Sequence, residues 1–470
     1  MLIKIQFILW SVITFVGPVV EARVDYLSGR ELCADKLANA KPSVSKTNSS
    51  KLKEENPYWV TVPKFYNKAH SFQYSTTEIY AYTLKPLNYN LPTLLFFMGG
   101  PGSSSRNIQF SLPHTNILYF EQRGVSCSRP LLEEDFYNPK FYSSEYTARD
   151  ALEIVKFLHL PSVTIYGHSF GTIPATIFAS LFPEYTRNLI LESVVSTADE
   201  LLIQSRLKKY YLQNLFNSFD VEKQNKIINI GKTFAPANWF SKAGTMMLYL
   251  NDGVLTYKRF LDNLLVTPDE NIKSAIEYFY FTSAEEDLFY SSQVVLGMLS
   301  CQETLVAKNN LSPDLVFDDK NNLQYDNEKS FFNLYCEQLK IPSSPNHIYR
   351  SQKYPVKVPI YYFLGESDGA TDLEQGLEHF NQVPQGERYL FVLKNGGHLP
   401  NLNFIKEYRS CEPSSSGDHC QTQNLNQHQV SIFNSIVQFN KIDSDLIESF
   451  NQLSPNPWFT DLPSFRLTKK

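Results

Sequence analysis

One stretch of ten residues, from Val163 to Thr172, constrains the fold of this chain more than any other. It begins with a β-branched and aromatic run typical of a strand, turns at Gly-His-Ser-Phe-Gly, and continues into a segment of helical character. Glycines two residues before and after Ser169 leave room for a very sharp strand-to-helix turn. The pattern predicts a nucleophile elbow, in which the Ser169 hydroxyl projects from the strand end and the Phe170 amide lies beside it.

Apolar runs and helical patterns alternate on both sides of this stretch. Continuous apolar runs of this kind are typical of strands that are covered on both faces. Such runs occur at 91–98 and 116–120, further strands are expected at 189–194 and 356–364, and a helix is expected over 144–158. Strands that alternate with helices predict a mostly parallel sheet, so the expected fold class is α/β with helices on both faces.

Changes in composition divide the 470 residues into segments. A lysine, an apolar core and the small residues around Glu21 predict a cleaved export signal over residues 1–22, with a retained anchor as the alternative. Residues 23–56 are polar, and we expect them to form a loosely packed lead-in. Residues 57–195 and 355–470 carry the strand pattern, whereas residues 196–354 are rich in helical patterns and predict an inserted cap.

Charge and cysteine content limit the partners of the chain. A net charge of −5 argues against nucleic acid and against stable binding to an anionic membrane. The predicted location is secreted or periplasmic, where disulfides among the six cysteines can form. Cys411 and Cys420 bracket a short loop that is suited to a local disulfide. No spacing of Cys or His predicts a metal site, and no cofactor is expected. The oligomeric state and the remaining cysteine pairing stay open.

Three residues that follow predicted strands occur in the order serine, acid, histidine. Serine acyl transfer needs a base for the hydroxyl proton and a carboxylate that orients this base, and Ser169, His398 and Asp368 meet these needs. Asp372 and, more distantly, Glu366 are alternative acids on the same turn. His398 is chosen among nine histidines because it follows a buried-strand run and a Gly-Gly pair late in the chain.

A glycine-rich turn is the candidate for the second half of an oxyanion hole. The apolar run that ends at Met98 is followed by Gly99-Gly100-Pro101-Gly102, where the backbone can approach a ligand closely. We expect the amides of Gly100 and Phe170 to be the oxyanion donors.

Five motifs together resemble a known family, the proline iminopeptidases and the related secreted tripeptidyl aminopeptidases. They are Gly99-Gly100-Pro101-Gly102, Glu121-Gln122-Arg123-Gly124, the elbow at Gly167–Gly171, Gly365 with Asp368, and Gly397-His398. The resemblance implies an α/β-hydrolase fold with a helical cap and serine exopeptidase activity. It covers residues 91–195 and 356–398 and is weak over the cap. This sequence departs from the family pattern at Glu121, where Asp is usual, and at Ser126, where Gly is usual.

The resemblance also implies features of the cap and of the substrate. The substrate is a peptide whose free α-amino group is held by cap carboxylates, with Glu303 as first candidate. Glu285 and Glu286 follow, although a solvated helix face explains these two equally well. A Cys301–Cys336 disulfide is implied in the cap. We expect an exported serine aminopeptidase that releases proline or short peptides. The alternatives are an exported carboxylesterase or lipase-like hydrolase with the same triad, and an inactive binding module.

Overall fold

The computed structural model describes residues 26–38, 55–66, 75–197, 206–235, 237–273, 276, 292–304, 315–325, 336, 341, 349–406 and 417–460. The predicted export signal lies outside the described residues, as do Cys411 and the two cap carboxylates Glu285 and Glu286.

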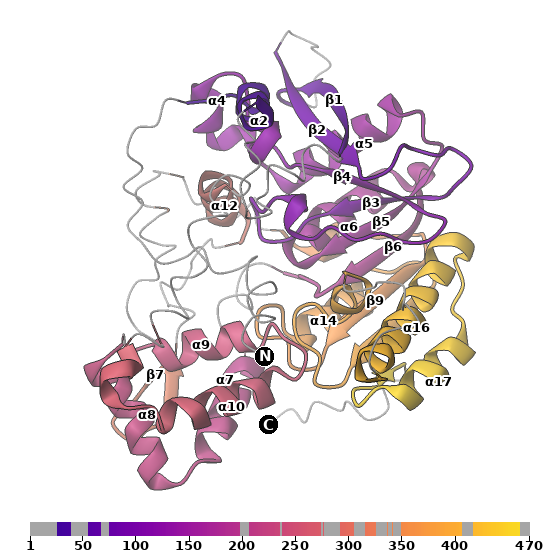
Figure 1. Ribbon diagram of the computed structural model, residues 1–470. Helices are drawn as coiled ribbons and strands as arrows, with labels where there is room; N and C mark the ends of the chain where they lie inside the picture. Colours follow the sequence, from indigo (N-terminus) through magenta and orange to yellow (C-terminus); the bar gives the residue numbers. More distant parts are fainter. Residues whose placement is uncertain are drawn as a thin grey trace.

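A nine-stranded sheet forms the centre of the molecule (Figure 1), in the order β1-β2-β4-β3-β5-β6-β9-β10-β11. The six strands from β4 to β10 in that order are parallel, and β1, β2 and β11 are antiparallel to their neighbours. The strands are β1 (Asn56–Pro63), β2 (Thr76–Thr83), β3 (Thr93–Phe97), β4 (Asn116–Phe120), β5 (Val163–His168), β6 (Thr186–Glu192), β9 (Ile360–Gly365), β10 (Arg388–Leu393) and β11 (Trp458–Phe459). The predicted mostly parallel α/β sheet is confirmed.

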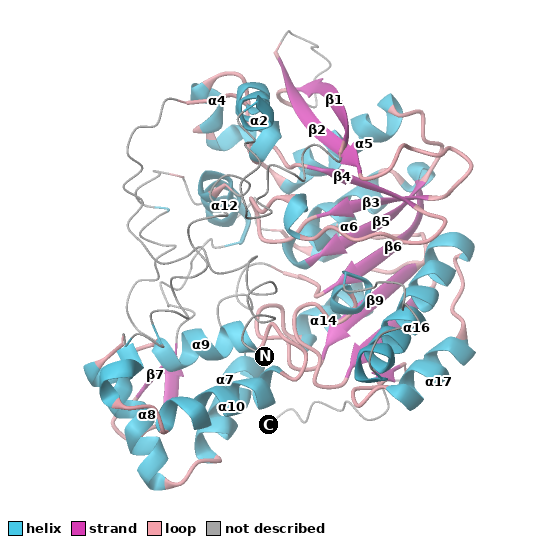
Figure 2. Cartoon of the chain, in the orientation of Figure 1, coloured by secondary structure: helices cyan, strands magenta, loops and turns pink. Residues whose placement is uncertain are grey.

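Helices cover both faces of this sheet (Figure 2). Alternate residues of each strand point to opposite faces, so Leu95 and Phe97 join one hydrophobic core, and Leu94 and Phe96 join another. The first core includes residues of α5 (Ser144–Phe157), α6 (Thr172–Leu181) and α14 (Leu373–Gln382). The second includes residues of α15 (Leu402–Lys406), α16 (Gly417–Phe439) and α17 (Ser444–Leu453). Burial on both faces explains why these strands read as continuous apolar runs.

The segment between β6 and β9 has a hydrophobic core of its own, which includes Trp239, Phe240 and Tyr257. It contains α7 (Arg206–Asn217), α8 (Val221–Thr233), α9 (Trp239–Met247), α10 (Gly253–Leu265), α12 (Gln293–Leu299) and a small sheet of β7 (Leu315–Phe317) with β8 (Leu323–Tyr325). In Figure 1, α7 to α10 gather beside β7, away from the large sheet. The chain leaves and re-enters the core beside a β-bridge between Thr197 and Arg350. We keep residues 196–354 as the proposed cap and call them the insertion.

No helix in the described part of the chain combines the length and the apolar character that crossing a membrane requires.

The described part of the N-terminal segment is not the loosely packed lead-in that its polar composition predicts. Residues Gly29–Ala38 form helix α2, and Cys33 is joined by a disulfide to Cys127 in the loop after β4. Further along, Glu55 is buried and paired with Arg106. A disulfide, a buried ion pair and the packing of Tyr26 against the core hold the described residues in place, and the polar composition gave no sign of these contacts.

A second disulfide joins Cys301 to Cys336 within the insertion. It is the pairing that the family resemblance implies, and it is confirmed.

Removing the N-terminal disulfide is expected to destabilise the fold strongly. Cys33 and Cys127 are 94 residues apart, and a closed loop of about 100 residues lowers the entropy of the unfolded chain enough to stabilise the fold by about 4–5 kcal/mol. Denaturant unfolding of a Cys33→Ala/Cys127→Ala variant should show this loss. In the matched control, Cys301→Ala/Cys336→Ala, a separation of 35 residues predicts a loss smaller by about 1 kcal/mol. A loss below about 1 kcal/mol for the first variant would contradict the account.

Candidate active site

The carboxyl ends of the parallel strands bring the predicted site residues to one edge of the sheet. The glycine loop (residues 99–102) follows β3, Ser169 follows β5, and Asp368 follows β9. The histidine loop (residues 395–401) follows β10. Loops that follow parallel strands share an edge, where ligands of open α/β sheets bind.

The turn at Ser169 has the geometry that its sequence predicts. β5 ends at His168, a single turn of 3₁₀ helix spans Ser169–Gly171, and α6 begins at Thr172. Ser169 has a φ of 55°, in the left-handed region that a non-glycine residue adopts only under constraint. A Cβ at Gly171 would lie 2.2 Å from the carbonyl oxygen of Phe97, which explains the glycine. Ser169 is the partly exposed residue among buried neighbours.

The structure brings Asp368 and His398 together in a buried pair. Nδ1 of His398 lies 2.9 Å and 3.0 Å from the two carboxylate oxygens of Asp368, and the histidine and aspartate side chains are 2% and 1% exposed. Burial acts to raise the pKa of the Asp368 carboxyl, but His398 and the amide of Ala370 outweigh it and hold the pKa below its ordinary value. Asp368 therefore stays charged, and Nε2 of His398 is the nitrogen left to exchange a proton.

The two alternative acids have other partners. Asp372 caps helix α14 and accepts a hydrogen bond from the amide of Gln375. Glu366 accepts one from the amide of Asn395, at the start of the histidine loop. The structure thus favours Asp368 over both.

His168 links the serine turn to the histidine loop. Its Nε2 lies 3.1 Å from the carbonyl oxygen of His398, the two rings are 5.0 Å apart, and Ser193 donates to the same oxygen. Burial lowers the pKa of His168 to about 3, so the ring is neutral and Nε2 carries the proton that it donates. The sequence excluded His168 as a base but did not predict this role.

The glycine loop lies directly against the nucleophile turn. A Cβ at Gly99 would lie 2.7 Å from Cβ of Ser169 and 2.7 Å from the carbonyl oxygen of His168. Only glycine permits so close an approach between these two loops. Gly100 follows with a φ of 45°. The structure thus places the loop of Gly100 beside Ser169 and Phe170, and the oxyanion role of the Gly100 and Phe170 amides stays a prediction.

Two parts of the insertion contact these loops. The amide of Ser292, which caps α12, donates to the carbonyl of Gly102 at 2.7 Å. The carbonyl of Tyr249 accepts from the amide of His398 at 3.0 Å, and its ring lies 4.6 Å from the imidazole. Asn251 accepts from the amide of Gly397 at 3.0 Å. The insertion therefore helps to shape both the glycine loop and the histidine loop.

Glu303, the first candidate for binding the substrate amino group, has a different position. Its two carboxylate oxygens accept hydrogen bonds from the amide and the hydroxyl of Ser144, at the beginning of α5. Burial raises the pKa of Glu303 to about 7 despite these bonds. The carboxylate is engaged with the helix end, so we do not retain it as an amino-group ligand. The family resemblance implied the Cys301–Cys336 disulfide but gave no sign of the contact between Glu303 and α5.

Glu192, at the end of β6, was not identified from the sequence. Its carboxylate accepts hydrogen bonds from the amides of Asn401 and Leu402, at 2.8 Å and 3.0 Å, and from the hydroxyl of Tyr166. These contacts fix the chain just after His398. Burial raises the pKa of Glu192 to about 7. A glutamate that ends the apolar run 189–191 is the signal that could have revealed it.

The sheet order, the elbow after β5 and the Asp–His pair after β9 and β10 define an α/β-hydrolase fold. In agreement, the model of the family described as alpha/beta hydrolase fold matches residues 92–280. No curated protein matches the chain.

The solved structures to which the chain is similar show low sequence identity. A protein described as Rv0554 from Mycobacterium tuberculosis is 11% identical, with 74% of this chain and 93% of that chain covered and a TM-score of 0.37. An alpha/beta hydrolase fold protein from Chitinophaga pinensis is 13% identical over 70% and 89%, with a TM-score of 0.35. A proline iminopeptidase-related protein from Thermus thermophilus is 16% identical over 74% and 92%, with a TM-score of 0.33.

Proposed function

We propose that this chain is a serine hydrolase that removes N-terminal residues from peptides through an acyl-enzyme. The observation that carries the hydrolase assignment is the buried Asp368–His398 pair at the same sheet edge as Ser169, which is held in a left-handed turn. A pre-oriented imidazole and a serine at a strained elbow are what nucleophilic acyl transfer requires.

The chemistry follows from these positions. Nε2 of His398 takes the proton as Oγ of Ser169 bonds to the substrate carbonyl carbon, and Asp368 stabilises the imidazolium. The amides of Gly100 and Phe170 hold the oxyanion. His398 then gives its proton to the leaving amine as the carbon–nitrogen bond breaks. Water, activated in the same way, hydrolyses the acyl-enzyme and regenerates Ser169.

The exopeptidase part of the proposal rests on two supports. The Gly-Gly-Pro-Gly and Gln-Arg-Gly motifs are found together in the aminopeptidases that the sequence resembles. The insertion contacts both the glycine loop and the histidine loop, a position from which it could restrict access to chain ends. Two disulfides are compatible with the proposed export.

A carboxylesterase is the second candidate, and one observation favours it. Glu303 is engaged with α5, and the described residues give no other assigned ligand for an amino group. Paired substrates separate the two functions, namely an aminoacyl or tripeptidyl naphthylamide with a free amine and its N-acetyl derivative. An aminopeptidase should hydrolyse the free amine at least about 100-fold faster, because acetylation leaves the groups that bind the amine unpaired. Equal rates would exclude an aminopeptidase and leave the esterase.

A further inference from the structure

We propose that Glu121 and Gln122, which directly follow β4, are positioning residues that hold the glycine loop from both sides and so set the oxyanion donor of Gly100. This inference rests on the proposed serine hydrolase function. Neither residue touches the reacting atoms, so both act through the loop.

The two ends of the glycine loop are bonded to consecutive residues that follow β4. Before the loop, the carbonyl of Met98 accepts a hydrogen bond from Nε2 of Gln122 at 3.0 Å. After the loop, Glu121 accepts from the hydroxyl of Ser104 at 2.7 Å and from the hydroxyl and amide of Ser105 at 3.1 Å and 3.3 Å. β3 and β4 are parallel neighbours, so their following loops meet at one edge. The glycines themselves carry no side chains, so these flanking bonds act on their backbone together with the bond from the amide of Ser292 to the carbonyl of Gly102.

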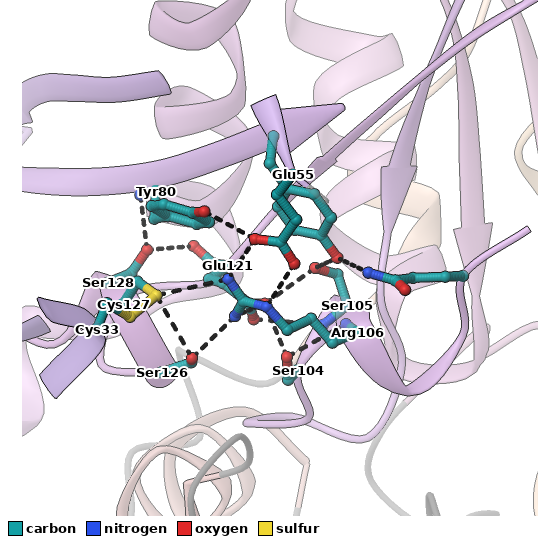
Figure 3. A network of polar contacts seen from close by, with 12 residues as sticks. Cys33, Glu55, Tyr80, Ser104, Ser105, Arg106, Glu121, Ser126, Cys127 and Ser128 are labelled. Carbon is teal, nitrogen blue, oxygen red and sulfur yellow. Dashed lines mark hydrogen bonds and ion pairs between the residues drawn. A yellow bond between two sulfur atoms is a disulfide. The ribbon is translucent and has the colours of Figure 1, made fainter. Parts of the chain in front are cut away.

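Glu121 is in turn fixed by a buried ionic network (Figure 3). Nη1 of Arg106 lies 3.0 Å from Glu121, and the same guanidinium binds both oxygens of Glu55 at 2.7 Å and 2.8 Å. The Arg106 side chain is 1% exposed and the two carboxylates are fully buried. A buried ion pair is stable only when the remaining hydrogen-bonding positions of its members are satisfied. The hydroxyls of Ser104 and Ser105 satisfy those of Glu121, so both serines belong to the network.

Among the described residues, the carboxylates of this network outnumber the guanidinium groups. Around Glu121 the described charged groups are Arg106 and Glu55, so two carboxylates share one guanidinium. Tyr80 and Tyr82 of β2 flank the guanidinium, and burial raises the pKa of each phenol, so both stay neutral. Burial raises the pKa of Glu121 to about 6, against the opposing effect of Arg106.

The protonation state of Glu121 therefore matters for the loop. The charged carboxylate accepts from both serines and from Arg106 at once. A protonated carboxyl must donate its new proton, so one of those donors has to turn away. Above about pH 6 the loop is held from both sides, and below it the hold on Ser104 and Ser105 weakens. The pH dependence of the activity should accordingly include a contribution from Glu121 near pH 6.

Two variants separate the charge from the hydrogen bonds. Glu121→Gln removes the ionisation and alters the bonds to Ser104 and Ser105. Gln122→Leu removes only the bond to Met98 and leaves the carboxylate in place. Both variants are expected to lower kcat about 10- to 100-fold, with KM changed less than about twofold. Complete loss of one oxyanion donor lowers kcat about 100- to 1,000-fold, and displacement of the donor should have a smaller effect. The contribution of Glu121 near pH 6 should be lost in Glu121→Gln and kept in Gln122→Leu. Glu153→Gln, which removes an exposed carboxylate paired with Lys156, is the matched control.

To complete the test, the rate at which a fluorophosphonate labels Ser169 is measured from mildly acidic to mildly alkaline pH. The melting temperature of each variant is measured alongside. The expected result is that the wild type is labelled and that both variants are labelled more slowly. Only Glu121→Gln should lose the contribution to the pH dependence near pH 6. Wild-type rates and pH dependence in Glu121→Gln would overturn the inference while leaving the hydrolase intact. If Glu121→Gln does not fold, unchanged kcat in Gln122→Leu overturns it instead. Failure to label wild-type Ser169 would overturn the proposed function itself.

Discussion

Ser169→Ala is expected to abolish hydrolysis, with kcat falling by about 10⁶. The variant lacks the atom that bonds to the substrate carbonyl, and the turn that holds Ser169 offers no second hydroxyl in its place. The rate should be measured on the naphthylamide substrates against a buffer blank, with circular dichroism and melting temperature as tests of the fold. Relief of the left-handed strain at residue 169 is not expected, since alanine also has a Cβ.

Ser180→Ala is the matched control for this variant. Ser180 lies near the other end of α6, the helix that follows the elbow, and is only partly buried. It should retain the wild-type rate. Activity of a pure Ser169→Ala preparation within about tenfold of the wild type would remove Ser169 from the mechanism.

Asp368→Asn is expected to lower kcat by about 10⁴ while leaving the fold intact. The amide conserves the size of the side chain but removes the negative charge, and its nitrogen can present a donor to Nδ1. His398 is then held in the wrong tautomer, and the imidazolium that forms during acyl transfer is no longer stabilised. Steady-state rates of this variant measure the effect.

Asp372→Asn decides between the two acids of this turn. Asp372 caps α14, and asparagine is an equally good capping residue, so activity should stay within about threefold of the wild type. The opposite order, with Asp372→Asn inactive and Asp368→Asn active, would show that the carboxylate bonded to His398 in the structure is not the catalytic acid.

The features of this fold that could be predicted from sequence are those that depend on local pattern. A continuous apolar run predicts a strand buried on both faces, and Gly-x-Ser-x-Gly after such a run predicts the turn at Ser169. Because the strands are parallel, their ends share an edge, so Ser169, Asp368 and His398 could be grouped without knowledge of tertiary contacts. The same reasoning placed the glycine loop beside the serine.

The features that could not be predicted depend on partners that are distant in sequence. Glu303 was interpreted from the sequence as a cap carboxylate that binds the substrate amino group. Its partner in the structure, Ser144, is 159 residues away in the chain. Glu55 lies in a polar stretch that gave no sign of burial, yet it binds Arg106, 51 residues later. His168 and Glu192 support His398 through its backbone and the residues after it, and backbone contacts leave little trace in residue type. Polar side chains whose partners are set by tertiary packing were therefore the ones missed.

The central claim is that Ser169 is the nucleophile of this chain, and covalent labelling tests it most directly. The wild-type protein is treated with a fluorophosphonate at mildly alkaline pH, digested, and analysed by mass spectrometry. The account predicts one phosphonyl adduct, on the peptide that contains Ser169, which is absent from Ser169→Ala and strongly slowed in Asp368→Asn. An unlabelled wild-type protein, or an adduct on a different serine such as Ser193, would contradict it.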